Sequence, residues 1–332
     1  MNKNSLRAAR NPAPQPILAA TGETPPLPRI AAGDLRRDQD LTPSELRALL
    51  DLAQAVKARP RDFQQSLKGR SLALLFEKPS LRTRLTFELA MQQLSGCAVT
   101  QTGPIGEREP VKDVARNLER WVNGIAARTF AQHTVDDLAE WAEVPVINAL
   151  SDLYHPCQVF ADLLTLEERF GKLKGLRLAY IGDGNNVAHS LMLTATRFGV
   201  NVSIASPPGY DPKPDIVGQA RKLAAASGSR IRLTHDPGEA VEGADAVYTD
   251  VWASMGLEHE AFERMVHFEP YRVDEPLMAR ARKSAIFLHC LPAKRGQEVT
   301  DDVMESKQSA VFQQAENRLH AQKALLLMLL AH

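Results

Sequence analysis

The sequence predicts an α/β protein of two domains, each a mainly parallel sheet flanked by helices. Short apolar runs of strand length alternate with longer amphipathic segments along most of the 332 residues. The alternation occurs in two series, and a long helical stretch near residue 152 separates them. A chain of this length also suggests roughly two domains, each large enough for its own core.

The first series of elements covers residues 42–149. A capping box at 42–45, with proline at the first helical position, predicts a helix to about residue 58. Residues 101–109 are rich in glycine and charge, which predicts a loop. The strands expected in this series span 71–76, 124–128 and 144–149. The other helices expected here span 82–94 and 111–122, with one more beginning at a Thr134 cap.

The turn between the first strand and its helix has the chemistry of an anion site. Ser80 is a suitable N-cap, and Gly96 stands where a helix C-cap is expected. Arg82 and Thr83 then lie on the first helical turn, where unpaired N–H groups and the helix dipole favour a phosphate. A capped helix with solvated arginines explains these residues equally well.

The second series follows the long connecting helix, which is expected at 152–170 with His155 and Gln158 near its start. We expect a hinge near residue 152 and an active site at the carboxyl ends of facing strands. A final leucine-rich helix is expected at 316–330. The strands expected in this series span 176–182, 201–206, 230–234, 246–251 and 285–291.

The composition excludes several classes of function. Lysine plus arginine and aspartate plus glutamate both number 40, so the net charge is near zero and nucleic acid is not an expected partner. No apolar run approaches the ~20 residues of a membrane span. The three cysteines show no metal or disulfide spacing, which favours a reducing compartment and a cytoplasmic location.

The first 33 residues are expected to form a flexible extension. They contain Lys3, Arg7 and Arg10 and six prolines but no acidic residue before Glu23. The missing apolar segment argues against a secretory signal, and the prolines argue against the amphipathic helix of a transit peptide.

The turn at 181–186 begins like a dinucleotide-binding fingerprint, but Val187 occupies the third glycine position. The next strand, at 201–206, has no acidic residue at its end to bind a ribose. We therefore expect no nicotinamide cofactor. The amides of Asn185 and Asn186 are suited to a small polar substrate, although a turn-forming role fits Asn185 better.

Two later strand ends carry further polar groups. The loop at 250–256 offers a carboxylate, a hydroxyl and a glycine-flanked backbone, which suit an amino acid, although an ordinary loop is equally compatible. The strand at 285–291 ends in His289 and Cys290, and a buried cysteine is usually an inert core residue. His155 is explained equally well as a capping or core residue.

These motifs occur together and in one order, and in that order they resemble a known family. From about residue 34 onward the chain is similar to the ornithine branch of the aspartate/ornithine carbamoyltransferases. The Asp-x-x-x-Ser-Met-Gly loop at 250–256 is the element that marks this branch. The motifs that carry the resemblance are Ser80–Arg84, Arg128, His155–Gln158, Asn186, Asp250–Gly256, His289–Pro292 and Arg318.

The resemblance implies carbamoyl transfer to the δ-amine of L-ornithine, giving citrulline, with no metal or cofactor, in a homotrimer or a multiple of trimers. The implied ligands of carbamoyl phosphate are Ser80, the Leu81 amide, Arg82, Thr83, Arg128, His155, Gln158, Cys290, Leu291 and Arg318. The implied ligands of ornithine are Asn186, Asp250, Ser254 and Met255. The implied catalytic group is Arg128, His155, Asp250, Cys290 and Arg318.

The resemblance also implies the domain division. Residues 34–152 form the carbamoyl phosphate domain, joined by a C-terminal helix at 317–332, and residues 153–316 form the ornithine domain. Three positions depart from the family pattern. Leu81 replaces a frequent threonine, Lys294 replaces a frequent histidine, and Pro104 replaces a polar residue that in relatives reaches a neighbouring subunit, a role Arg108 could take over.

Other functions remain open at this point. One is a carbamoyltransferase for N-acylated ornithine or putrescine, which the loop for a free amino acid disfavours. Another is a silent paralogue that binds a metabolite, which the complete set of arginines disfavours. A dehydrogenase is disfavoured by Val187. Whether the reaction serves the synthesis or the breakdown of arginine is not encoded in the site.

Overall fold

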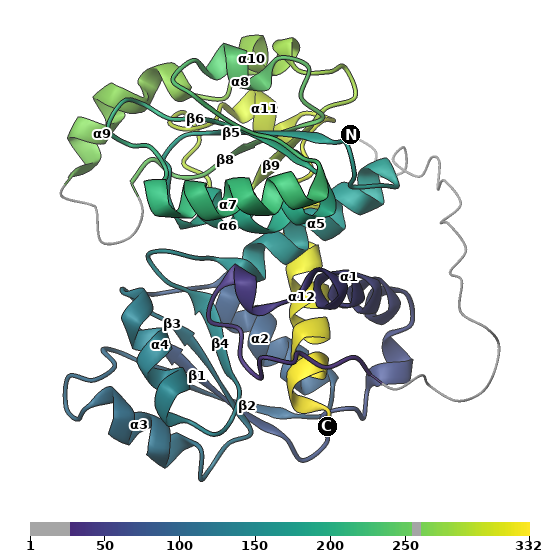
Figure 1. Ribbon diagram of the computed structural model, residues 1–332, viewed down its shortest axis with the longest axis vertical. Helices are drawn as coiled ribbons and strands as arrows, with labels where there is room; N and C mark the ends of the chain where they lie inside the picture. The colour runs from purple at the N-terminus through teal and green to yellow at the C-terminus, as the bar shows by residue number, and fades with distance from the viewer. Residues whose placement is uncertain (1–26, 254–259) are drawn as a thin grey trace, which may run out of the picture.

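The computed structural model describes residues 27–253 and 260–332, and within them two α/β domains are stacked along the long axis of the molecule (Figure 1). The first contains a four-stranded sheet of order β2-β1-β3-β4, and the second a five-stranded sheet of order β7-β6-β5-β8-β9. Neighbouring strands pair in parallel throughout both sheets. The predicted fold class is therefore confirmed.

The first domain lies between residues 27 and 150. Its strands are β1 (Ser71–Phe76), β2 (Cys97–Thr102), β3 (Gly124–Arg128) and β4 (Val146–Leu150). Its helices are α1 (Pro43–Ala58), α2 (Arg82–Gln93), α3 (Val111–Leu118) and α4 (Gln132–Trp141), with the 3₁₀ turns η1 (Asp38–Asp40) and η2 (Pro60–Phe63).

Helix α5 (Pro156–Phe170) leads from the first domain into the second. The strands of the second domain are β5 (Arg177–Ile181), β6 (Asn201–Ala205), β7 (Ile231–Thr234), β8 (Ala246–Thr249) and β9 (Ile286–His289). Its helical elements are α6 (Asn186–Ala195), η3 (Thr196–Phe198), α7 (Pro214–Ser227), α8 (Pro237–Val241), α9 (Ala261–Phe268), η5 (Glu269–Tyr271), α10 (Glu275–Arg280) and α11 (Asp301–Glu305).

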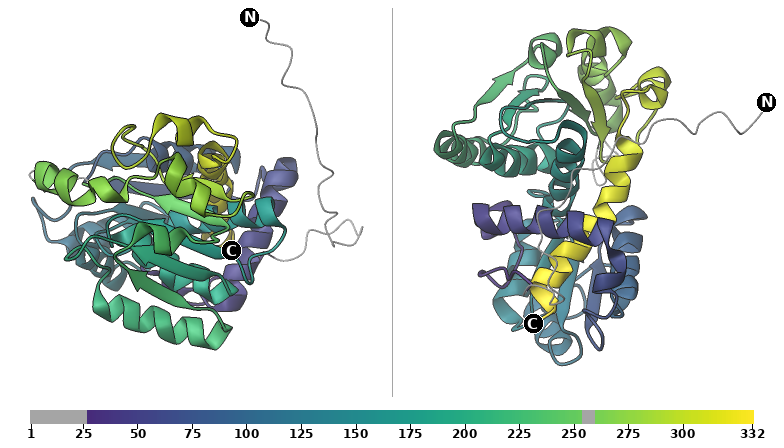
Figure 2. Two further views of the ribbon diagram at one scale, coloured as in Figure 1. Left: turned by 90° about the horizontal axis from the view of Figure 1, so that it is seen from above. Right: turned by 90° about the vertical axis from the view of Figure 1, so that its right-hand side faces the viewer.

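Helix α12 (Val311–Leu330) runs back from the second domain into the first, as the views of Figures 1 and 2 agree. It packs against α5, α1 and α2, and its buried leucines join the core that those helices form. The prediction that a C-terminal helix packs back on the first domain is confirmed. In the part of the chain that the structure describes, no helix, α12 included, has the length and apolar character that crossing a membrane requires.

The predicted helix starts are partly confirmed. The capping box is present, because the Glu45 backbone N–H donates to Thr42 Oγ1 at 3.2 Å. The predicted Ser80 cap is wrong, since α2 begins at Arg82 and the residue before it is Leu81. The Thr134 cap is also wrong. Helix α4 begins two residues earlier, and its first N–H group, that of residue 132, donates to the Asp152 carboxylate at 2.7 Å.

Strand β2 and the end of α2 differ from the expectations. The sequence analysis missed β2, a mostly exposed edge strand whose last two residues fall within the predicted 101–109 loop. The left-handed residue after α2 is Ser95, with φ of 64°, and not Gly96. Gly96 is required for a different reason. A Cβ there would lie 2.6 Å from Met91 Cε and 3.1 Å from the Arg70 carbonyl oxygen.

We therefore expect Gly96→Ala to lower the free energy of unfolding by about 1–3 kcal/mol, because the added methyl overpacks the α2–β2 turn. Urea unfolding measures this change. Gly218→Ala is the matched control, since that glycine lies in α7 and a methyl added there would have nothing within 4 Å. The control should be neutral or stabilising by up to ~1 kcal/mol. Equal stability of Gly96→Ala and the parent protein would contradict the close packing.

Candidate active site

Three buried or partly buried guanidinium groups converge where the two domains meet. Arg82 lies on the first turn of α2, Arg128 at the end of β3, and Arg318 on α12. Burial lowers the pKa of Arg128 to about 10, and the charges of Arg318 and Arg82 act in the same direction. Burial likewise lowers the pKa of Arg82 and of Arg318. All three stay charged near neutral pH, so this place favours an anion of more than one charge.

A chain of hydrogen bonds links three helices at this point. Arg318 Nη2 donates to Thr83 Oγ1 at 2.8 Å, and Arg318 Nη1 donates to Gln158 Oε1 at 3.0 Å. Each of these side chains is almost fully buried. Residues from α2, α5 and α12 are thus held in one fixed arrangement beside the other two arginines.

His155 enters the same place from the start of α5. Its backbone N–H donates to Ser190 Oγ at 2.8 Å, which fixes the turn into the helix. Its ring Nδ1 is buried and has no hydrogen-bond partner among the described residues. Burial lowers the pKa of His155 well below its ordinary value, and the charges of Arg318 and Arg128 act in the same direction. The imidazole is therefore neutral at pH 7, with one ring nitrogen that can donate a hydrogen bond and one that can accept.

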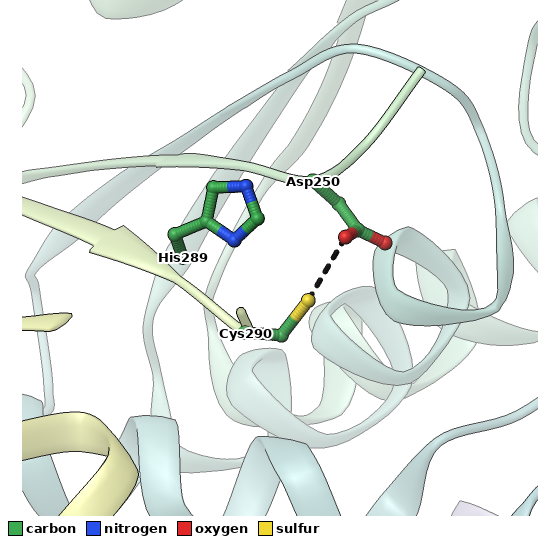
Figure 3. Close-up of side chains that lie close together, drawn as sticks. All are labelled: Asp250, His289 and Cys290. Atoms are coloured by element: carbon green, nitrogen blue, oxygen red, sulfur yellow. Dashed lines mark hydrogen bonds between the residues drawn. The ribbon is translucent and has the colours of Figure 1, made fainter. Parts of the chain in front are cut away.

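Asp250 lies on the side of the second domain, just after β8, and contacts the cysteine that follows β9 (Figure 3). Cys290 Sγ donates to Asp250 Oδ1 at 2.9 Å, and Asn185 Nδ2 donates to Asp250 Oδ2 at 3.0 Å. Burial raises the pKa of Cys290 well above its ordinary value, and the Asp250 charge raises it further. The thiol is therefore protonated and is not a nucleophile at neutral pH.

The ligand atoms of Asp250, His289 and Cys290 lie within 4.8 Å of one another, as a metal site would require. However, both His289 nitrogens already have protein partners. Nδ1 accepts from the Leu291 N–H at 2.9 Å, and Nε2 pairs with the buried Glu298 carboxylate at 3.2 Å. The histidine is thus held by the turn that follows β9, and a metal ion would have to displace one of these contacts.

The remaining predicted residues differ in how closely they approach the candidate site. Asn186 Nδ2 donates to the Ser151 carbonyl oxygen at 2.6 Å, which leaves its own amide oxygen as an acceptor. The Leu81 side chain is 67% exposed, so only its backbone is suited to the site, beside the half-buried Ser80. Leu291 follows β9 with a positive φ of 59°. Two predicted residues, Ser254 and Met255, lie outside the described residues.

The sequence analysis missed a second role of Asn185. Its side chain caps α6 by accepting from the Val187 N–H at 2.9 Å, which the turn pattern indicated, and it also orients Asp250. It missed Arg264 as well, whose Nη1 donates to the Asp183 carboxylate and to the Trp252 carbonyl, each at 2.9 Å. No local pattern announces either contact, since each joins residues far apart in the sequence.

Comparison with known proteins extends these observations. Residues 34–168 match the model of the aspartate/ornithine carbamoyltransferase carbamoyl-P binding domain, and residues 174–329 match that of the Asp/Orn binding domain. An ornithine carbamoyltransferase of Carboxydothermus hydrogenoformans is 50% identical over 88% of this chain and 95% of its own length. The chain belongs to the aspartate/ornithine carbamoyltransferase family.

Solved structures of the family have the same fold. The ornithine carbamoyltransferase of Pyrococcus furiosus is 46% identical, with a TM-score of 0.88 over 91% of this chain and 98% of that chain. A more distant structure, an acetylornithine transcarbamylase complexed with acetylcitrulline, is 32% identical, with a TM-score of 0.81 over 90% and 99%. The family therefore includes members that differ in the amine substrate.

We expect iodoacetamide to modify Cys290 at least about tenfold more slowly than Cys97 at pH 8, because only the thiolate reacts and Cys97 is exposed. Mass spectrometry of the two peptides measures both rates in one sample. Asp250→Asn should accelerate modification of Cys290 and leave Cys97 unchanged, since it removes the charge that opposes the thiolate. Faster modification of Cys290 in the parent protein would contradict the assigned protonation state.

Proposed function

We propose that this protein transfers the carbamoyl group of carbamoyl phosphate to the δ-amine of L-ornithine, giving L-citrulline and phosphate. The observation that carries the proposal is the convergence of Arg82, Arg128 and Arg318 beside a neutral His155, opposite the Asp250–Cys290 pair. About 50% identity to ornithine carbamoyltransferases supports it. The chemistry uses positioning and electrostatics and requires no metal or cofactor.

The first domain binds carbamoyl phosphate. Arg82, with Ser80, Thr83 and the Leu81 backbone amide, holds the phosphate at the positive end of the α2 dipole. Arg128 lies between the phosphate and the carbonyl oxygen. The remaining contacts come from Gln158, which accepts from the carbamoyl NH2, and from Arg318, which orients the carbamoyl group.

The reaction is a nucleophilic substitution at the carbamoyl carbon. The neutral δ-amine attacks that carbon, and negative charge develops first on the carbonyl oxygen and then on the departing phosphate. His155 and Arg128 donate to the carbonyl oxygen, and Arg82 stabilises the phosphate as it leaves. The amine gives up its proton before attack, so the rate rises with pH through the ionisation of the amine.

The second domain binds ornithine. Asp250 and Ser254 recognise the α-ammonium group, while Asn186 and the Met255 backbone bind the α-carboxylate. Cys290 and Leu291 lie beside the δ-amine. We place the boundary between the two ligand-binding domains near residue 152, with α12 assigned to the first. Three free thiols suit a cytoplasmic location.

The main alternative is a carbamoyltransferase that acts on a different amine, such as N-acetylornithine or putrescine. The acetylornithine enzyme is the less similar relative, at 32% against about 50% identity. Asp250 is buried and held by Asn185 and Cys290, which fits a positively charged partner and not an acylated nitrogen. A catalytically silent paralogue would have no need to keep three arginines together.

We predict that Arg82→Ala or Arg128→Ala lowers kcat/KM for citrulline formation by roughly 30- to 1,000-fold, or ~2–4 kcal/mol of transition-state binding. Arg84→Ala is the matched control. It lies on the same turn but is exposed, with Glu88 as its ion-pair partner at 3.7 Å, so its loss should be nearly neutral. If Arg82→Ala and Arg84→Ala have similar effects, the phosphate assignment is wrong.

We predict a substrate order of ornithine far ahead of lysine, putrescine and N-acetylornithine. Lysine is one methylene too long, putrescine lacks both α groups, and acylation removes the ammonium partner of buried Asp250, a penalty of a few kcal/mol. A colorimetric assay for ureido products measures all four amines. A higher kcat/KM with N-acetylornithine or putrescine than with ornithine would overturn the assignment of Asp250.

We also propose a homotrimer or a multiple of one. Leu85 and Leu89, four residues apart on α2, are about two-fifths exposed. They form a small apolar stripe on the surface of the first domain that suits contact with further copies of the chain. Light scattering should give three times the chain mass, and Leu89→Glu should weaken the assembly. An active monomer at micromolar concentration would refute the proposal.

A further inference from the structure

A fully buried carboxylate lies next to the site, and the proposed chemistry does not use it. Asp162 lies on α5, one turn after Gln158, and its exposure is 0%. Its Oδ1 accepts two side-chain hydrogen bonds, from Gln158 Nε2 at 2.8 Å and from Gln314 Nε2 at 2.7 Å. Its Oδ2 is buried and has no hydrogen-bond partner within residues 27–253 and 260–332. One oxygen atom therefore holds two glutamines.

The two glutamines point to opposite halves of the site. Gln158 Oε1 accepts from Arg318 Nη1 at 3.0 Å, on the side of the carbamoyl group. Gln314 Oε1 accepts from the His289 backbone N–H at 2.9 Å, at the end of β9 and next to Cys290. Each glutamine thus uses its NH2 group on Asp162 and its oxygen on a group of the site, and Gln314 Nε2 also donates to the Tyr248 hydroxyl at 3.1 Å.

An amide side chain can offer either end, so its orientation depends on what its neighbours accept or donate. A carboxylate oxygen that accepts both NH2 groups forces both glutamine oxygens to face away from it. Burial raises the pKa of Asp162 to about 7, but Oδ1 remains an acceptor whether or not the other oxygen carries a proton. Each amide is therefore held at both ends, by Asp162 at its NH2 group and by Arg318 or the His289 N–H at its oxygen, and Asp162 is the acceptor that the two glutamines share.

We propose that Asp162 is a positioning residue that fixes the amide orientation of Gln158 and Gln314, and through them aligns the carbamoyl half of the site with the Cys290 half. This inference rests on the proposed function, because it gives Gln158 the acceptor role toward the carbamoyl NH2. Asp162 touches neither substrate. It binds the NH2 groups of both side chains and so helps to keep their oxygen atoms toward the arginine and β9.

The test compares three variants in the citrulline assay. Asp162→Asn keeps an acceptor oxygen and should stay within about fivefold of the parent kcat/KM. Asp162→Leu has a similar shape but no acceptor, and should lower kcat/KM at least 30-fold, since unpaired buried N–H groups are costly and the amides can turn. Thr165→Val is the matched control. It removes another buried α5–α12 hydrogen bond, from Asn317 Nδ2 at 2.9 Å, and should stay within about fivefold.

A double-mutant cycle separates positioning from general destabilisation. If Asp162 acts through Gln158, the loss in Asp162→Leu/Gln158→Leu is much smaller than the product of the two single losses. A loss equal to that product would overturn the proposal, as would an Asp162→Leu variant within fivefold of the parent or no more impaired than Thr165→Val.

A further variant keeps the proposal testable if Asp162→Leu does not fold. Gln314→Leu removes the link between Asp162 and the end of β9. It should raise the KM for ornithine at least threefold while the KM for carbamoyl phosphate changes less than twofold. The reverse pattern, or no change in either KM, would contradict the assignment.

Failure of the parent protein to form citrulline would refute the proposed function alone. In that case the same cycle of Asp162 and Gln158 variants, measured by urea unfolding, tests the positioning contact, and absence of coupling would refute it.

Discussion

The structure depends on keeping three guanidinium groups close together in a partly dehydrated place. Like charges repel, and burial adds to that cost, as the lowered pKa of each arginine indicates. Two buried acidic side chains, Asp162 and Asp250, supply negative charge nearby, Asp162 only in part because burial raises its pKa to about 7. The remaining free energy comes from packing elsewhere, chiefly the leucines of α12 that enter the core of the first domain.

Helices α5 and α12 join the two domains and both contribute side chains to the candidate active site. They pack against each other and carry a line of buried polar groups that bond across the interface, including Thr165 with Asn317 and Asp162 with Gln314. These buried hydrogen bonds allow few alternative alignments of α5 and α12, because a shift along either helix leaves buried polar groups unpaired. Specificity of alignment is thus built into the same helices that carry His155 and Arg318.

Local sequence patterns predicted much of this architecture. The features that the sequence analysis missed depend mainly on exposure or on contacts between residues far apart in the sequence. The alternation of strands and helices and the Thr42 capping box depend on neighbours in sequence, and they were predicted correctly. Strand β2 was missed because an exposed edge strand has little apolar signal. The Ser80 cap was wrong because α2 begins at Arg82 and has no side-chain cap hydrogen bond. The role of Asp162 and the contact of Asn185 with Asp250 carry no local signature, since the partners lie on distant elements.

The return of α12 to the first domain has a consequence for how the chain folds during synthesis. Residues 321–330 are part of the same apolar core as α1, α2 and β1, yet they are translated after every strand of both sheets. The domain that is made first therefore lacks a core helix until translation has passed the second domain. Domains usually fold in the order in which they emerge from the ribosome. In this chain the strands of the second domain are all synthesised while the first domain still exposes the apolar surface that α12 covers.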